Sequence, residues 1–86
     1  PTCMPEIWVY YTEGRGNLGA LRAAAQAWGA LPGYAGAELL VSSGQPAPEG
    51  PLYLLVTRWR GEVPALELPA GTKGWAFAVL EEVLAP

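Results

Sequence analysis

Histidine and aspartate are both absent from the 86 residues, and cysteine occurs only once, at Cys3. Without histidine the chain cannot build a His-centred catalytic triad, a zinc site of the usual Cys/His types or a proximal haem ligand. A single cysteine excludes an intramolecular disulfide, and no histidine is available to activate Cys3 as a nucleophile. The sequence therefore predicts neither a metal nor a cofactor. Any acid–base chemistry would have to use Glu, Tyr, Lys or the chain termini.

Basic residues are also scarce. Five Lys and Arg stand against eight Glu, which gives a net charge of −3, and only 15% of the residues are charged. Such a chain lacks the basic surface that nucleic-acid binding requires. The opening stretch PTCMPEIWVYY has no basic region of the kind that begins a signal peptide, and no apolar run is long enough to span a membrane. We therefore expect a cytoplasmic protein that binds neither nucleic acid nor membranes.

Apolar residues, in contrast, are plentiful. Hydrophobic residues make up 51% of the chain, and four Trp and four Tyr are among them. The length predicts a single domain over residues 1–86. Because a domain of this size has much surface for its volume, so large an apolar content is a first indication of self-association.

The first half of the chain predicts two strands around a helix. Residues 6–13 (EIWVYYTE) are rich in β-branched and aromatic residues and read as a strand that is apolar on both faces. Ile7, Val9 and Tyr11 share one face, and Trp8 and Tyr10 share the other, which we assign to an interface with another copy. A helix is expected from a cap at Asn17 to about residue 31, and a second strand over residues 36–43.

The predicted helix carries one apolar stripe. Leu18, Leu21, Ala25 and Trp28 repeat at helical spacing along it. A loop rich in Pro and Gly follows the second strand, and residues 52–59 (LYLLVTRW) predict a third strand that is again apolar on both faces.

The last quarter of the chain is ambiguous. Residues 61–71 read as irregular because Pro64 and Pro69 bracket them. Residues 72–85 favour a helix that Thr72 caps, although WAFAVL within them has the rival interpretation of a fourth strand. The resulting order β-α-β-β-α is typical of an α+β sheet whose helices pack on one face. Because two helices cover only one face, we expect the other face to be covered by a second copy of the chain, in a homodimer.

Gly14, Gly16 and Gly19 have the G-x-G-x-x-G spacing of a dinucleotide-binding fingerprint, and Glu38 stands where an acidic ribose ligand would be expected. The chain is too short for the larger parallel sheet that such a site requires. The favoured interpretation is structural: Gly14 and Gly16 form a tight strand-to-helix turn, and Gly19 allows the helix to approach the sheet closely.

Three stretches carry a resemblance to a known family. They are the glycine turn at Gly14, LPGYAGAELLVSS at the helix-to-strand junction, and LYLLVTRW. Over residues 6–60 the chain resembles the antibiotic biosynthesis monooxygenase-like family. The resemblance implies a ferredoxin-like β-α-β-β-α(-β) unit with an antiparallel sheet, its helices on one face, that forms a dimeric α/β barrel. The C-terminal quarter matches poorly, so the family's last strand is expected to be shortened or missing.

The resemblance also suggests site residues. Haem-degrading members have an Asn in the first strand, a Trp after the third strand and a His on the second helix. Trp59 matches the Trp, but the Asn position falls near Ile7 and the chain has no histidine. Cofactor-independent, quinone-forming members use Trp, Tyr, Arg and Asn residues without a metal. This comparison predicts that Trp59 and Tyr11 stack a small aromatic or quinone-type substrate, while Arg58 stabilises a developing phenolate.

Each of these residues has a structural interpretation as well. Buried aromatic side chains usually belong to a core or an interface, and arginines at a strand end are usually solvated. The sequence therefore leaves two functions open: a cofactor-independent, monooxygenase-like enzyme, or a non-catalytic domain that binds a ligand or only dimerises. The missing His and Asn favour the second.

Overall fold

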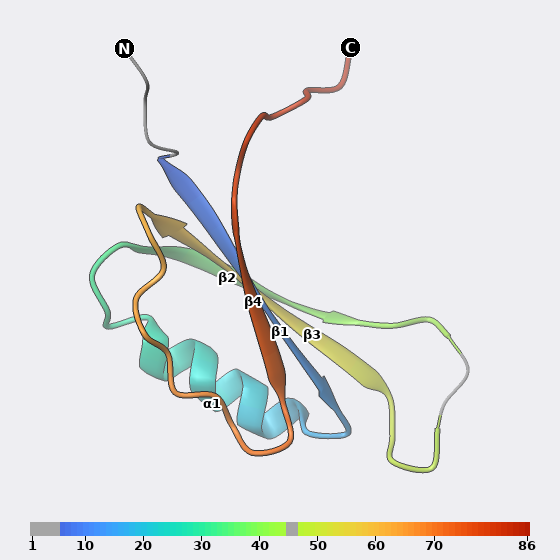
Figure 1. Ribbon diagram of the computed structural model, residues 1–86. Helices are drawn as coiled ribbons and strands as arrows, with labels where there is room; N and C mark the ends of the chain where they lie inside the picture. Colours follow the sequence, from blue (N-terminus) through green and yellow to red (C-terminus); the bar gives the residue numbers. More distant parts are fainter. Residues whose placement is uncertain (1–5, 45–46) are drawn as a thin grey trace.

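The computed structural model describes residues 6–44 and 47–86, which form one four-stranded sheet and one α-helix (Figure 1). In chain order the elements are β1 (Ile7–Arg15), α1 (Leu18–Trp28), β2 (Tyr34–Val41), β3 (Leu52–Arg60) and β4 (Lys73–Ala78). The predicted helix and first three strands are thus confirmed, with ends that shift by a few residues.

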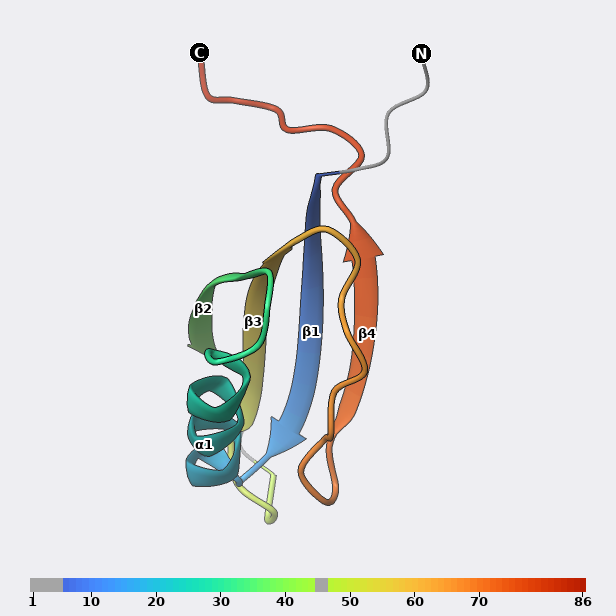
Figure 2. The same cartoon turned by 90° about the vertical axis from the view of Figure 1, so that its left-hand side faces the viewer.

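The strands lie in the order β2-β3-β1-β4, and each is antiparallel to its neighbours. In the central strand β1, Tyr11 pairs with Val56 of β3 on one side and with Trp75 of β4 on the other. Helix α1 and residues 61–72, which we call the 61–72 connection, lie on the same side of this sheet (Figures 1 and 2). The arrangement is compatible with a ferredoxin-like α+β fold.

The helix predicted over residues 72–85 is wrong. Lys73–Ala78 form strand β4 instead, and residues 79–86 form neither helix nor strand. The sequence of β4 alternates large and small side chains, which is the period of a strand: Trp75 and Phe77 point to one face, and Gly74 and Ala76 to the other. A small residue is needed at Gly74, because a Cβ atom there would collide with the Tyr10 hydroxyl. Residues 73–78 form hydrogen bonds with the edge of β1 that β3 leaves free. The helical spacing of the segment gave no indication of this pairing.

The core lies between α1 and the sheet. Its buried cluster consists of Leu21, Ala24 and Trp28 from α1 together with Leu55 and Trp59 from β3. Leu21, Ala24 and Trp28 follow one another at helical spacing. The predicted stripe is thus confirmed at Leu21 and Trp28, whereas Ala24 is the buried alanine and Ala25 is only partly buried. From β1, Trp8 and Tyr10 pack against the same cluster, and the Tyr10 ring meets Trp28 edge-on with centroids 6.0 Å apart.

Gly16 forms the turn between β1 and α1, whereas Gly14 still belongs to β1 and pairs with Tyr53, so the turn role predicted for Gly14 is wrong. Gly16 has a φ of 70°, and its N–H donates to the Pro51 carbonyl oxygen over 2.9 Å. A Cβ atom at Gly16 would collide with the Glu49 carbonyl oxygen, so the turn is both left-handed and tightly packed. Gly19 lies in the helix with no atom within 4 Å of the position a Cβ would take. The close helix–sheet approach predicted for Gly19 is therefore wrong, because this residue lies on the exposed side of α1.

Two alanine substitutions should separate these roles. We expect Gly16→Ala to lower the free energy of unfolding by about 1–3 kcal/mol, because the turn forces a left-handed backbone on the new side chain. Gly19→Ala should raise it by about 0.5–1 kcal/mol, because alanine favours an exposed helical position. Urea denaturation of both variants measures the difference. Equal effects at the two positions would contradict this account of the motif.

Candidate functional site

Trp59, the first of the predicted site residues, is enclosed by the core. It is only 1% exposed. Its indole N–H donates to the Thr57 hydroxyl over 2.9 Å, and its ring meets Tyr34 edge-on with centroids 5.5 Å apart. Thr57, itself fully buried, donates in turn to the Tyr10 carbonyl oxygen. The indole thus has its polar group satisfied inside the protein and offers little surface for stacking a ligand.

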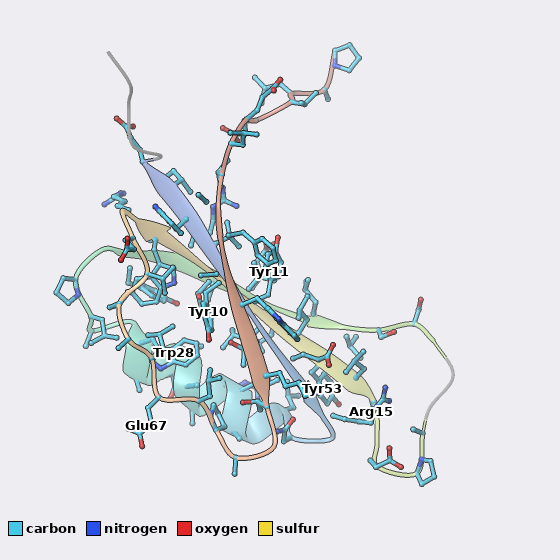
Figure 3. All side chains as sticks on the ribbon, in the orientation of Figure 1. Tyr10, Tyr11, Arg15, Trp28, Tyr53 and Glu67 are labelled. Carbon is cyan, nitrogen blue, oxygen red and sulfur yellow. The ribbon has the colours of Figure 1, made fainter. Side chains whose placement is uncertain are left out.

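Tyr11 and Arg58 lie on the opposite face of the sheet from Trp59. Side chains alternate between faces along a strand, and paired residues of neighbouring strands share a face. Tyr11 pairs with Val56, and Arg58 pairs with Val9, so both lie away from the core cluster. Figure 3 shows Tyr10 directed toward Trp28 and Tyr11 directed to the other side of the sheet. The structure brings Tyr11 and Arg58 to one face and does not bring Trp59 to them.

The sheet face that carries Tyr11 is apolar, and we call it the open face. Neither α1 nor the 61–72 connection packs on it (Figure 1). All four strands contribute apolar side chains to it: Val9, Tyr11, Leu40, Leu54, Val56, Trp75 and Phe77. Charged residues share this face as well: Arg58 pairs with Val9, Glu38 pairs with Val56, and Glu13 pairs with Lys73.

The assignment of Trp8 and Tyr10 to an interface with another copy is therefore wrong. These two side chains pack against the core cluster, and it is the alternate set with Val9 and Tyr11 that lies on the open face. The alternation itself was correctly predicted. Which set the helix covers could not be chosen from the sequence, because both sets are apolar and aromatic.

The open face is large enough to matter energetically. Phe77 is 53% exposed and Trp75 is 47% exposed, and the Phe77 ring meets Tyr11 edge-on with centroids 5.4 Å apart. Four strands spaced about 4.8 Å apart and about six residues long give a face of roughly 400 Å² in projection. The exposed aromatic side chains on this face make it a candidate interaction surface.

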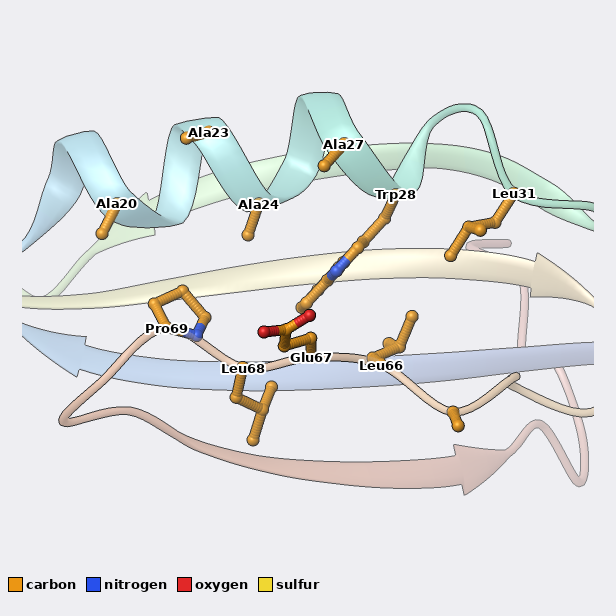
Figure 4. Close-up of a pocket in the computed structure, with 11 residues that line it drawn as sticks. Ala20, Ala23, Ala24, Ala27, Trp28, Leu31, Leu66, Glu67, Leu68 and Pro69 are labelled. Carbon is orange, nitrogen blue, oxygen red and sulfur yellow. The ribbon is translucent and has the colours of Figure 1, made fainter.

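A groove runs along the other side of the molecule, between α1 and the 61–72 connection (Figure 4). Its volume is about 610 Å³. The helix wall consists largely of alanines, and their short side chains leave the space between the two walls unfilled: Ala20, Ala23, Ala24 and Ala27. Leu66, Glu67, Leu68 and Pro69 form the facing wall.

Several residues of these surfaces escaped prediction. Trp75 and Phe77 fell in a segment expected to be helical, although the alternation of large and small residues around them was a signal for a strand. The groove depends on the irregular course of the 61–72 connection, for which the sequence offers no periodic signal. Cys3, discussed above as a thiol, lies outside the described residues.

Comparisons of the chain with protein-family models, with curated proteins and with solved structures found no match. Among the residues that the structure describes, no helix has both the length and the apolar character needed to cross a membrane.

Proposed function

We propose that this protein is a homodimeric, non-catalytic domain that associates with a second copy of itself through the open face. The observation that carries the proposal is the continuous set of apolar side chains on that face, with Phe77 and Trp75 about half exposed. Covering a half-exposed aromatic side chain is worth about 1 kcal/mol, so the whole set offers several kcal/mol toward association.

A second copy is the occupant that fits this face best. Two-fold packing places the same apolar patch on both sides of the interface, so each sheet supplies the cover that the other lacks. Two faces of about 400 Å² in projection give about 800 Å² in total, just under the roughly 1,000 Å² expected of a specific interface. Glu38 and Arg58 on the β2 and β3 side, and Glu13 with Lys73, would then lie as polar neighbours around the apolar contact of Tyr11, Trp75 and Phe77.

Sedimentation equilibrium tests the proposal. We expect a mass of twice 9.1 kDa, that is 18.2 kDa, at micromolar concentration. A mass of 9.1 kDa across the same range would contradict it. The mass should also stay that of a dimer when the sodium chloride concentration is raised. Salt screens exposed charges and does not weaken apolar contacts.

Cofactor-independent oxygenation of a small aromatic or quinone-type compound remains a prediction of the sequence resemblance. It assigns Trp59, Tyr11 and Arg58 to one site, whereas Trp59 lies on the face of the sheet opposite to the other two. A substrate stacked between Trp59 and Tyr11 would require the core around Trp59 to open. The geometry therefore favours the non-catalytic hypothesis.

A further inference from the structure

Residues 79–86, which we call the 79–86 segment, present large apolar side chains to solvent. Leu80 is 96% exposed, Val83 is 85% exposed and Leu84 is 78% exposed, and these are the highest values among the exposed large hydrophobic residues of the described chain. The segment follows β4, the edge strand that carries Trp75 of the open face. It runs past the end of the sheet and away from α1 (Figures 1 and 2). Among the residues that the structure describes, it therefore has no apolar cover.

The open face carries positive charge at the end of the sheet where β3 and β4 finish. Arg58 and Arg60 of β3 are two residues apart and share this face, and both are exposed. Gly36 of β2 pairs with Arg58, and no atom lies within 4 Å of the position that a Cβ would take at Gly36. Glu38 is the one acidic residue of β2. The strands β2 and β3 thus carry a net positive charge here, beside unfilled space.

The open face by itself offers less area than a specific interface needs. Two such faces give about 800 Å², whereas roughly 1,000 Å² is expected. Burial of one Leu or Val side chain removes roughly 60–120 Å² from water, so three of them from each of two copies add about 360–720 Å². The apolar side chains of the 79–86 segment would therefore bring the interface to the size of a specific one.

We propose that the 79–86 segment of one copy crosses to the other copy and lies against the end of the open face that carries Arg58 and Arg60. This contact rests on the dimer of the proposed function and extends it. A two-fold axis parallel to the strands places β4 of one copy over β2 of the other and keeps the same strand ends together. The segment then leaves β4 beside Arg58 and Arg60 of the other copy. Its acidic residues Glu81 and Glu82 bring the complementary charge to these arginines.

Sedimentation equilibrium of the full chain and of charge variants tests the contact. Arg60→Glu should raise the dissociation constant of the dimer about tenfold, because it brings negative charge against the acidic residues of the 79–86 segment. Arg22→Glu makes the same change of charge at an exposed position of α1, on the side of the sheet away from the open face. It is the matched control and should leave association unchanged.

Exchange of the charges makes the test specific for the two partners. Arg58→Glu together with Arg60→Glu should weaken the dimer, and so should Glu81→Lys together with Glu82→Lys. A chain that carries all four changes should associate about as strongly as the unchanged chain, because opposite charges again face each other. It also has the net charge of the unchanged chain. A combined variant as weak as either pair of changes would overturn the proposed contact.

Removal of the apolar side chains tests the other half of the contact. Leu80→Ser together with Leu84→Ser should raise the dissociation constant at least about tenfold, because both side chains lose apolar contact with the other copy. If the unchanged chain sediments as a monomer, the proposed dimer and this contact both fail. If Phe77→Glu dissociates the dimer but the changes at Leu80, Leu84 and Arg60 do not weaken it, the dimer stands and this contact alone is overturned.

Discussion

Phe77→Glu is expected to convert the proposed dimer into a monomer. Phe77 lies on the open face, where its ring contacts Tyr11, and about half of its surface is exposed to solvent. A glutamate at this position would bring a charge into the interface, and its neighbour across the strands, Val9, offers no partner for it. Because an unpaired buried charge costs about 3–5 kcal/mol, the dissociation constant should rise at least a hundredfold or so. Sedimentation equilibrium over a range of concentrations measures this change.

Two further variants make this result specific. Gln26→Glu adds the same charge to an exposed position of α1 and should leave the dimer intact. Phe77→Lys introduces the opposite charge and should dissociate the dimer as strongly, because the loss of apolar contact and the burial of charge do not depend on sign. If both Phe77 variants associate as strongly as the unchanged chain, the interface must lie elsewhere on the molecule. Far-UV circular dichroism checks that each variant is folded.

Trp59→Ala is expected to lower the free energy of unfolding by about 3–5 kcal/mol, the usual cost of truncating a large aromatic side chain in a core. Trp59 is almost fully enclosed, and its removal also leaves the buried Thr57 hydroxyl without its donor. Since small domains are stable by only about 5–15 kcal/mol, this change takes away a large share of the total. Urea denaturation followed by tyrosine and tryptophan fluorescence measures it.

The conservative change Trp59→Phe gives a graded test if the alanine variant does not fold. It keeps most of the apolar contact and removes the hydrogen bond to Thr57, so we expect a loss of about 1–2 kcal/mol. The hypothesis that Trp59 stacks a substrate makes a different prediction: a ligand-facing tryptophan contributes little to stability. A loss below about 1 kcal/mol for Trp59→Ala would therefore contradict the core role assigned to this residue.

Much of the fold could be predicted because its elements carry strong local patterns. The apolar stripe that includes Leu21 and Trp28 predicted the position of α1, and the dense β-branched and aromatic runs predicted β1 and β3. For the segment of β4 the helix was favoured over the rival strand because Ala76, Val79, Leu80 and Val83 repeat at helical spacing. The pairing of Trp75 with Tyr11 decides for the strand. Long-range hydrogen bonding to a free sheet edge overrode the local pattern there.

The candidate surfaces were harder to predict than the fold. The composition of β1 and β3 predicted that one face of the sheet would lack a cover. It did not predict which of the two faces this would be. Both sets of β1 side chains, Trp8 with Tyr10 and Val9 with Tyr11, are equally suited to a core. The choice depends on which side α1 takes, and that is fixed by the left-handed turn at Gly16 and the packing of the helix on Leu55 and Trp59.

Direct contacts between two copies across the open face would test the central claim most sharply. In a sample that mixes ¹³C-labelled and unlabelled chains, isotope-filtered NOE spectra report only distances between copies. We expect contacts from the exposed methyl groups of Leu40 in one copy to the aromatic rings of Trp75 or Phe77 in the other, and none from the alanines of α1. Contacts that arise from α1, or a sample without contacts between copies, would contradict the assignment of the open face as the dimer interface.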